Sequence, residues 1–180
     1  MQPRVIGLDL AAESTGVALP DGTTSTVKAP KAAGKKRTLL DDLNRLNHVG
    51  STIAYLLADH KPDLVVIEDY AAGIKSAAAH RLAEIGGCVR WSCYVHDLPI
   101  ALVNNMHLKI YATGAARGVE KGDMRISALK RAGAEFANDD ECDAWWLRAM
   151  GLDHLGHAPV TLPKTHRNAL AKVEWPEVSA

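Results

Sequence analysis

Four carboxylates, far apart along the chain, occupy positions where acidic side chains can do chemistry. Asp9 interrupts an apolar, strand-like run, Glu68 ends a second such run, and Asp140 and Asp143 lie three residues apart near the start of a predicted helix. An unpaired ionised carboxylate in a buried strand costs roughly several kcal/mol, so Asp9 needs a compensating cation or hydrogen bonds. Residues three apart share one face of a helix, so the last two acids can point at the same place.

Clustered carboxylates repel one another and take up protons unless cations neutralise them. The oxygen ligands of these four residues suit Mg²⁺ or Mn²⁺. Two such ions, about 3.5–4 Å apart, can activate a water and stabilise the leaving oxygen of an in-line attack on a phosphodiester. We therefore predict a metal site made by Asp9, Glu68, Asp140 and Asp143. For Asp9 taken alone, a core carboxylate held by local hydrogen bonds is the alternative.

Two acids next to the helix pair need a separate interpretation. Asn138 and Glu141 have the spacing of a capping box, so we expect Glu141 to close the start of the helix rather than to bind metal. Asp139 lies in the first turn, where the helix dipole favours a negative charge, and it is an alternative to Asp140 as a ligand.

The elements that must position these acids follow from hydrophobic periodicity and turn signals. Residues 5–10, 16–19 and 23–27 predict an antiparallel three-stranded meander. A long amphipathic helix over 38–60 followed by a strand over 64–68 predicts a βαβ crossover, which makes the strands of Asp9 and Glu68 parallel neighbours. The remaining predicted elements are a helix over 76–95, a strand over 99–103, and helices over 105–113, over 123–134 and from 138 onward.

Composition indicates one domain of a cytoplasmic protein. The chain has 180 residues, 47% of them hydrophobic, and its 21 basic residues balance its 21 acidic ones. The three cysteines form no CxxC pair, which suits a reducing compartment, and we expect them to be small buried hydrophobes. No signal segment or membrane span is predicted. We divide the chain into a catalytic domain over 1–156 and a basic C-terminal tail over 157–180.

Basic residues gather in two segments despite the neutral total. The stretch 28–37 holds five cations and no acid, and a solvated loop is its alternative interpretation. A second group lies between 109 and 131. Phosphate contacts by such side chains position a nucleic acid without reading its sequence, so the two segments together predict a DNA path. The cations are Lys28, Lys31, Lys35, Lys36 and Arg37 in the first segment, and Lys109, Arg117, Lys121, Arg125, Lys130 and Arg131 in the second.

The chain resembles the RuvC-type Holliday junction resolvases of the ribonuclease H-like superfamily. The matching stretches are 6–9 with 14–16, 66–68 and 140–144. The resemblance covers roughly residues 4–155 and implies an α/β, ribonuclease H-like fold with a five-stranded mixed sheet flanked by α-helices. It also implies that the four acids hold divalent metal. It further implies that Lys109 and Lys121 contact the phosphate of the cleaved strand, and that Lys121 has a catalytic role. Tyr70 would lie at the junction centre. The expected DNA contacts are Lys35, Lys36, Arg37, Tyr70, Lys109, Arg117 and Lys121.

The expected function is a structure-selective DNA endonuclease that resolves four-way junctions by symmetric phosphodiester hydrolysis in recombination and repair. It would use Mg²⁺, with Mn²⁺ as a substitute, and two ions per site. We expect a two-fold homodimer with the 76–95 helix in the interface, because a symmetric junction needs two symmetric cuts.

Three alternatives remain. One is a ribonuclease H-like nuclease acting on forks, flaps or RNA. Another is a non-catalytic junction-binding module. The third is a sugar or acetate kinase-like phosphotransferase, which the chain length nearly excludes, because such enzymes have a duplicated body.

Overall fold

The structure is a computed structural model that describes residues 2–69 and 77–178, with the side chains of residues 77, 78 and 121 left out. Five strands form one sheet: β1 (Val5–Asp9), β2 (Ser14–Ala18), β3 (Thr24–Lys28), β4 (Leu64–Asp69) and β5 (Ile100–Asn104). Their order is β3-β2-β1-β4-β5. β1 pairs antiparallel with β2 and parallel with β4, so the predicted meander, crossover and mixed sheet are confirmed.

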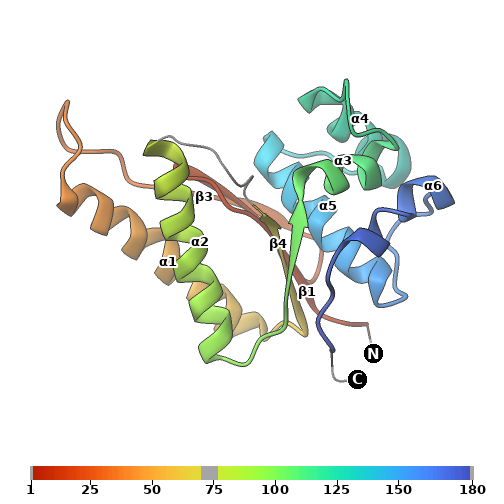
Figure 1. The fold of residues 1–180 in the computed structure, drawn as a ribbon, viewed down its shortest axis with the longest axis horizontal. Helices are drawn as coiled ribbons and strands as arrows, with labels where there is room; N and C mark the ends of the chain where they lie inside the picture. The colour runs from red at the N-terminus through yellow and green to blue at the C-terminus, as the bar shows by residue number, and fades with distance from the viewer. Residues whose placement is uncertain (1, 70–76, 179–180) are drawn as a thin grey trace.

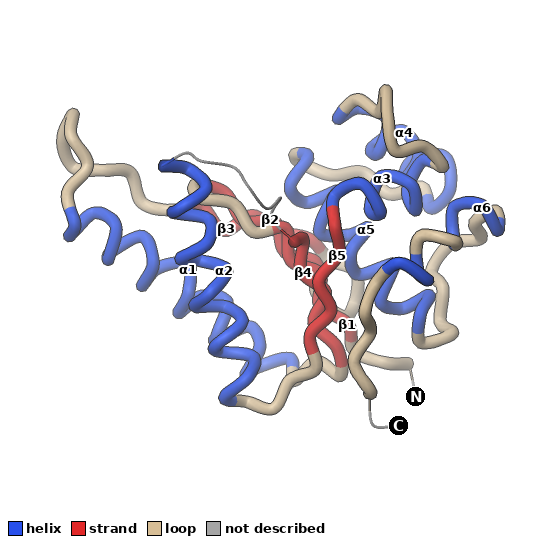
Figure 2. Tube along the Cα trace, in the orientation of Figure 1, coloured by secondary structure: helices blue, strands red, loops and turns tan. Residues whose placement is uncertain are grey.

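Helices cover both faces of this sheet (Figures 1 and 2). The bounds are α1 (Leu39–His60), α2 (Ala77–Val95), α3 (Asn105–Thr113), α4 (Lys121–Ala132), α5 (Asp139–His154), α6 (Lys164–Arg167) and the short 3-10 helix η1 (Leu170–Lys172). α1 and α2 lie on one face, and α3, α4, α5 and α6 lie on the other (Figure 1). The helix predicted over 123–134 begins two residues earlier, at Lys121, because Glu120 and Asp123 form a capping box there.

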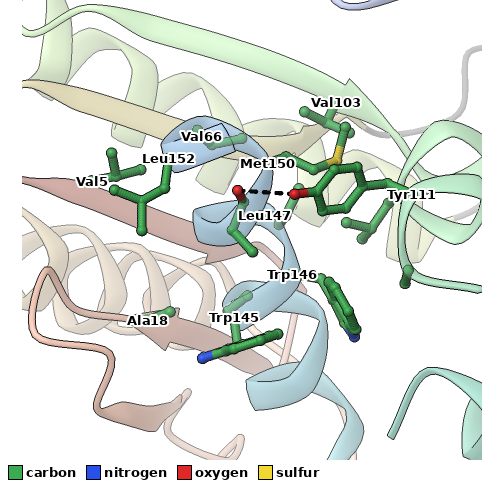
Figure 3. Close-up of a cluster of buried hydrophobic side chains, with 14 of the residues drawn as sticks. Val5, Ala18, Val66, Val103, Tyr111, Trp145, Trp146, Leu147, Met150 and Leu152 are labelled. Atoms are coloured by element: carbon green, nitrogen blue, oxygen red, sulfur yellow. Dashed lines mark hydrogen bonds between the residues drawn. The ribbon is translucent and has the colours of Figure 1, made fainter. Parts of the chain in front are cut away.

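Alternating side chains of the central strands enter two separate cores. Ile6 and Leu8 of β1 pack with α1 and α2, whereas Val5 packs with α5. The second core is built around the two tryptophans of α5, Trp145 and Trp146, which are nearly fully buried, as expected for helix-core residues (Figure 3). In the same core the Tyr111 hydroxyl donates a hydrogen bond to the carbonyl of Ala149 over 3.3 Å.

The C-terminal segment packs on this second core. Val160, Leu162 and Val173 are buried in it, and the exposed Arg167 forms an ion pair of 2.7 Å with the fully buried carboxylate of Asp153. The ring of Trp175 stacks on His154, with 4.3 Å between the ring centroids. Residues 157–178 thus contribute apolar side chains and one buried ion-pair contact to the domain body.

The structure corrects one expectation about the cysteines. Cys93 and Cys142 are buried as predicted, but Cys88 is exposed on α2, where its Cβ would be 3.9 Å from a Cβ added at Gly50 of α1. No helix in the described ranges has the length and apolar character that crossing a bilayer requires.

Candidate active site

Strand register brings Asp9 and Glu68 together at one edge of the sheet. Leu8 of β1 pairs with Ile67 of β4, so the two acids that follow lie level on parallel neighbours. Successive side chains of a strand alternate between faces. Val5 of β1 and Val66 of β4 face α5. Asp9 and Glu68 are separated from these residues by even numbers of positions, so they face α5 as well.

Helix α5 lies against β1 and β2 at backbone contact distance because two glycines leave room for it. A Cβ atom added at Gly7 would stand 2.1 Å from the carbonyl oxygen of Ala144, and one added at Gly16 would stand 2.0 Å from the carbonyl oxygen of Asp140. Both neighbours are backbone atoms of α5, which cannot rotate away. The two glycines therefore determine how closely the start of α5 approaches the strand acids.

We expect Gly16→Ala to displace the start of α5 and to destabilise the protein by about 1–3 kcal/mol or more, the usual effect of overpacking. Thermal unfolding measures the change in stability, and metal-dependent cleavage measures the displacement of Asp140. Gly122→Ala is the matched control, since nothing lies within 4 Å of a Cβ atom at that position. A Gly16→Ala protein with wild-type unfolding temperature would show that the contact is not tight.

The approach of α5 completes a carboxylate cluster. Oxygen atoms of Asp9, Glu68 and Asp143 all lie within 4.8 Å of one another, close enough to bind one metal ion. Asp140, one helical turn before Asp143, accepts a hydrogen bond of 2.5 Å from the Ser14 hydroxyl of β2. Asp140 also lies near enough to raise the pKa of Asp9 by charge repulsion. Three of the four predicted acids thus form the cluster, and the fourth is held at its margin.

The electrostatics of the cluster favour protons or cations. Burial is the largest cause that raises the pKa of Asp9, and together with repulsion from Glu68, Asp143 and Asp140 it brings that pKa to about 9. Burial also raises the pKa of Glu68, although the hydrogen bond from Asn105 and the positive charge of Lys109 oppose the rise. Without a cation at the site, the Asp9 carboxyl is therefore protonated beside Glu68. The donor set, with its oxygen chemistry and unneutralised charge, fits a divalent metal ion.

One cation and one amide from α3 reach the same cluster. Asn105 donates a hydrogen bond of 2.8 Å from its Nδ2 to Oε1 of Glu68. Lys109, one turn further along the helix, lowers the pKa of Glu68 through its charge. No local sequence pattern marks Asn105 or Ser14 as a partner of the acids. The pair Asn104-Asn105 signalled only a helix cap, a role that Asn104 alone takes by accepting from the N–H of Met106.

The other two acids at the start of α5, Asp139 and Glu141, have partners outside the carboxylate cluster. Asn138 caps the helix by accepting the N–H of Glu141 over 3.0 Å. The Glu141 side chain does not complete the expected capping box and accepts hydroxyl hydrogen bonds from Thr24 and Thr26 of β3, each of 2.9 Å. That part of the prediction is wrong because β3 supplies two donors to the carboxylate. Asp139 lies 3.8 Å from Arg125 in an ion pair.

The other expected DNA contacts lie outside the cluster. Arg117 lines a groove beside α4. Lys35, Lys36 and Arg37 lie on the loop between β3 and α1, which extends away from the sheet (Figure 2), and Arg37 pairs with Asp42 at 3.5 Å. Tyr70 and the side chain of Lys121 lie outside the described residues.

The sheet order, the position of α5 across β1 and β2, and the acidic cluster at the ends of β1 and β4 define a ribonuclease H-like protein. The structure of T. thermophilus RuvC in complex with Holliday junction substrate has the same fold, with a TM-score of 0.65, 14% identity, and 88% of this chain and 99% of that chain covered. The crossover junction endodeoxyribonuclease RuvC of Acidobacterium capsulatum is 30% identical over 122 residues, 62% of this chain and 70% of that protein. The chain belongs to the RuvC family of crossover junction endodeoxyribonucleases.

A second relative extends the likeness over most of the chain. The crossover junction endodeoxyribonuclease RuvC of Halorhodospira halophila is 28% identical over 173 residues, which is 90% of this chain and 96% of that protein. No protein-family model matches the chain. Family membership therefore rests on the relative from Acidobacterium capsulatum, and the fold agrees with it.

Proposed function

We propose that this protein is a metal-dependent endonuclease that resolves four-way DNA junctions by symmetric phosphodiester hydrolysis in recombination and repair. The observation that carries the proposal is the convergence of Asp9, Glu68 and Asp143 within 4.8 Å in a chain of the RuvC family. A relative with the same fold holds a Holliday junction, which supports the choice of substrate. Such a substrate places the protein in the cytoplasm with the DNA.

In this proposal Asp9, Glu68 and Asp143 hold Mg²⁺, or Mn²⁺ in its place, and Asp140 completes a site for two ions. When bound, two such ions polarise a phosphodiester and lower the pKa of a water molecule. The chain itself arranges the ligands: Ser14 orients Asp140 through its hydroxyl, and Asn105 orients Glu68 through its amide. Lys109 lies beside Glu68, where its charge stabilises a phosphate bound at the cluster.

The remaining expected contacts surround this centre as part of the same proposal. Lys35, Lys36, Arg37 and Arg117 bind phosphates of the junction arms, Lys121 steadies the cleaved strand, and Tyr70 lies at the junction centre. Such contacts position DNA and make its binding depend on salt.

A panel of DNA substrates tests the function. A four-way junction, a replication fork, a flap and a linear duplex are incubated with the protein, with and without Mg²⁺ or Mn²⁺. We expect paired nicks in the junction that require the metal, and no cutting of linear duplex. Preference for forks or flaps would favour a different ribonuclease H-like nuclease, and junction binding without cutting in either metal would favour a non-catalytic module. Equal cutting of linear duplex would contradict the resolvase proposal.

We also propose that two copies pair through α2. The outward face of this helix exposes Trp91, Tyr94 and Val95, at 65%, 71% and 50% of their surface. The rings of Trp91 and Tyr94 stack with 5.7 Å between their centroids, which forms one apolar patch. Large aromatic side chains are enriched in interface cores, and a two-fold pair provides the two sites that a symmetric junction needs.

Trp91→Glu is expected to convert the dimer into a monomer, because it places a charge in the centre of the proposed interface. Sedimentation analysis with the wild-type protein as reference measures the change. Tyr55→Glu is the control, since Tyr55 is equally exposed, at 69%, but lies on α1. A wild-type protein that sediments as a monomer, or a Trp91→Glu variant that remains dimeric, would contradict this interface.

A further inference from the structure

A basic groove lies between the end of α3, the loop that follows it and α4. Its volume is about 530 Å³, and the cations among its lining residues are Arg117, Lys130 and Arg131. Asp123 is the one acid that lines it among the described residues, and its carboxylate accepts the N–H of Glu120 at the start of α4. The groove therefore carries an excess of two positive charges.

The three cations are available to a ligand. Within the described part of the chain none of them forms an ion pair, and all three residues are exposed. Arg131 is partly oriented, because its Nε donates to the Ser127 hydroxyl over 3.2 Å. Ser127 in turn donates to the carbonyl of Ala112 at the end of α3. The groove is thus tied to α3 by a chain of hydrogen bonds.

Helix α3 connects the acidic cluster to this groove and sets the distance between them. Its first residue, Asn105, donates to Glu68, and its last residue, Thr113, lines the groove. Eight residues of α-helix at 1.5 Å each span about 12 Å. Phosphates of one strand of a duplex advance about 3.4 Å per nucleotide along its axis, so a junction arm that runs parallel to α3 places about three or four nucleotides over 12 Å. Lys109 lies between the two ends, so positive charge continues along the helix.

We propose that this groove binds the sugar–phosphate backbone of one junction arm three or four nucleotides from the cleaved bond, with Arg117, Lys130 and Arg131 as the phosphate contacts. The inference rests on the proposed function, since the distance is counted from the acidic cluster. It assigns the groove to positioning and leaves the reaction to the cluster.

The double variant Lys130→Gln/Arg131→Gln tests the phosphate-binding role of the groove. We expect it to bind a metal-free four-way junction about tenfold more weakly and to lower the slope of log affinity against log salt by about 2, close to 0.9 for each phosphate that the variant no longer neutralises. The control variant Lys61→Gln/Lys164→Gln removes the same charge from exposed positions outside the groove. Equal affinity and slope in the wild-type and the groove variant would overturn the proposal.

Neutral phosphates test the position of the groove along the DNA. Junctions carry a methylphosphonate at the third and fourth phosphates on either side of the cut, or at a distant control position. We expect substitution on one side to weaken binding by the wild-type protein and to have no further effect on the groove variant. Additive effects, or weaker binding only at the control position, would show that the groove binds elsewhere.

Failure of the proposed function gives a different result. In that case the wild-type protein neither prefers nor cleaves the junction. Binding by the groove variant is measured without metal and without cleavage, so the two failures are distinguishable.

Discussion

Replacing Asp9 with asparagine is expected to reduce cleavage of a four-way junction by at least about 10³-fold, which corresponds to about 4 kcal/mol of transition-state stabilisation. Asp9 belongs to the acidic cluster, in which oxygen atoms of Asp9, Glu68 and Asp143 lie within 4.8 Å of one another. An amide of the same shape removes the charge that a metal ion needs and preserves the packing. We therefore expect junction binding, measured without metal, to stay within about threefold of wild type, since phosphate contacts supply most of it.

Asp139→Asn, a substitution of the same kind on α5, tests whether the loss of cleavage in Asp9→Asn comes from the metal site or from a general reduction of negative charge. Asp139 lies beside Arg125 at 3.8 Å rather than in the three-residue cluster. Asp139→Asn should retain cleavage, whereas Asp140→Asn should abolish most of it. Full activity of Asp9→Asn would mean that the active site has been misplaced, and an inactive Asp139→Asn protein would show that Asp139 takes the ligand role expected of Asp140.

Metal binding is expected to strengthen by up to about tenfold per pH unit between pH 7 and 9, a total of about 100-fold. The pKa of Asp9 is raised to about 9, so a metal ion must displace a proton from this carboxyl throughout that range. Titration of Mn²⁺ into the DNA-free protein at several pH values, followed by calorimetry, measures both the affinity and the released proton. An affinity that does not change with pH would contradict a protonated Asp9 in the metal-free site.

The same shift predicts how stability of the metal-free protein changes with pH. A carboxyl whose pKa is raised on folding binds more protons in the folded state than in the unfolded state at every pH between its ordinary value and about 9. The free energy of unfolding therefore falls as pH rises through that window. Asp9→Asn lacks this titration, so the unfolding temperature of the variant should increase relative to that of wild type between pH 5 and pH 9. Added Mg²⁺ should raise the unfolding temperature of the wild-type protein but not that of Asp9→Asn.

Local sequence patterns determined the strands and helices that carry the acids. The apolar runs that end near Asp9 and Glu68, with a long amphipathic helix between them, predicted parallel neighbouring strands, and β1 and β4 do pair in parallel. The spacing of Asp140 and Asp143 predicted one helix face, and Asn138 predicted the start of that helix. These inferences succeeded because strand alternation, helical periodicity and capping depend on residues within a few positions of each other.

Tertiary structure alone decided how the acids are held. Ser14 reaches Asp140 across 126 residues, and Thr26 reaches Glu141 across 115, so no local pattern links them. The glycines at 7 and 16 both fall in predicted strands, yet it is their missing side chains that let the backbone of α5 approach. The raised pKa of Asp9 likewise comes from burial and from charges that meet only in the folded chain. Sequence determined which residues carry charge and which face they share, whereas close packing of distant segments determined which of those charges come together.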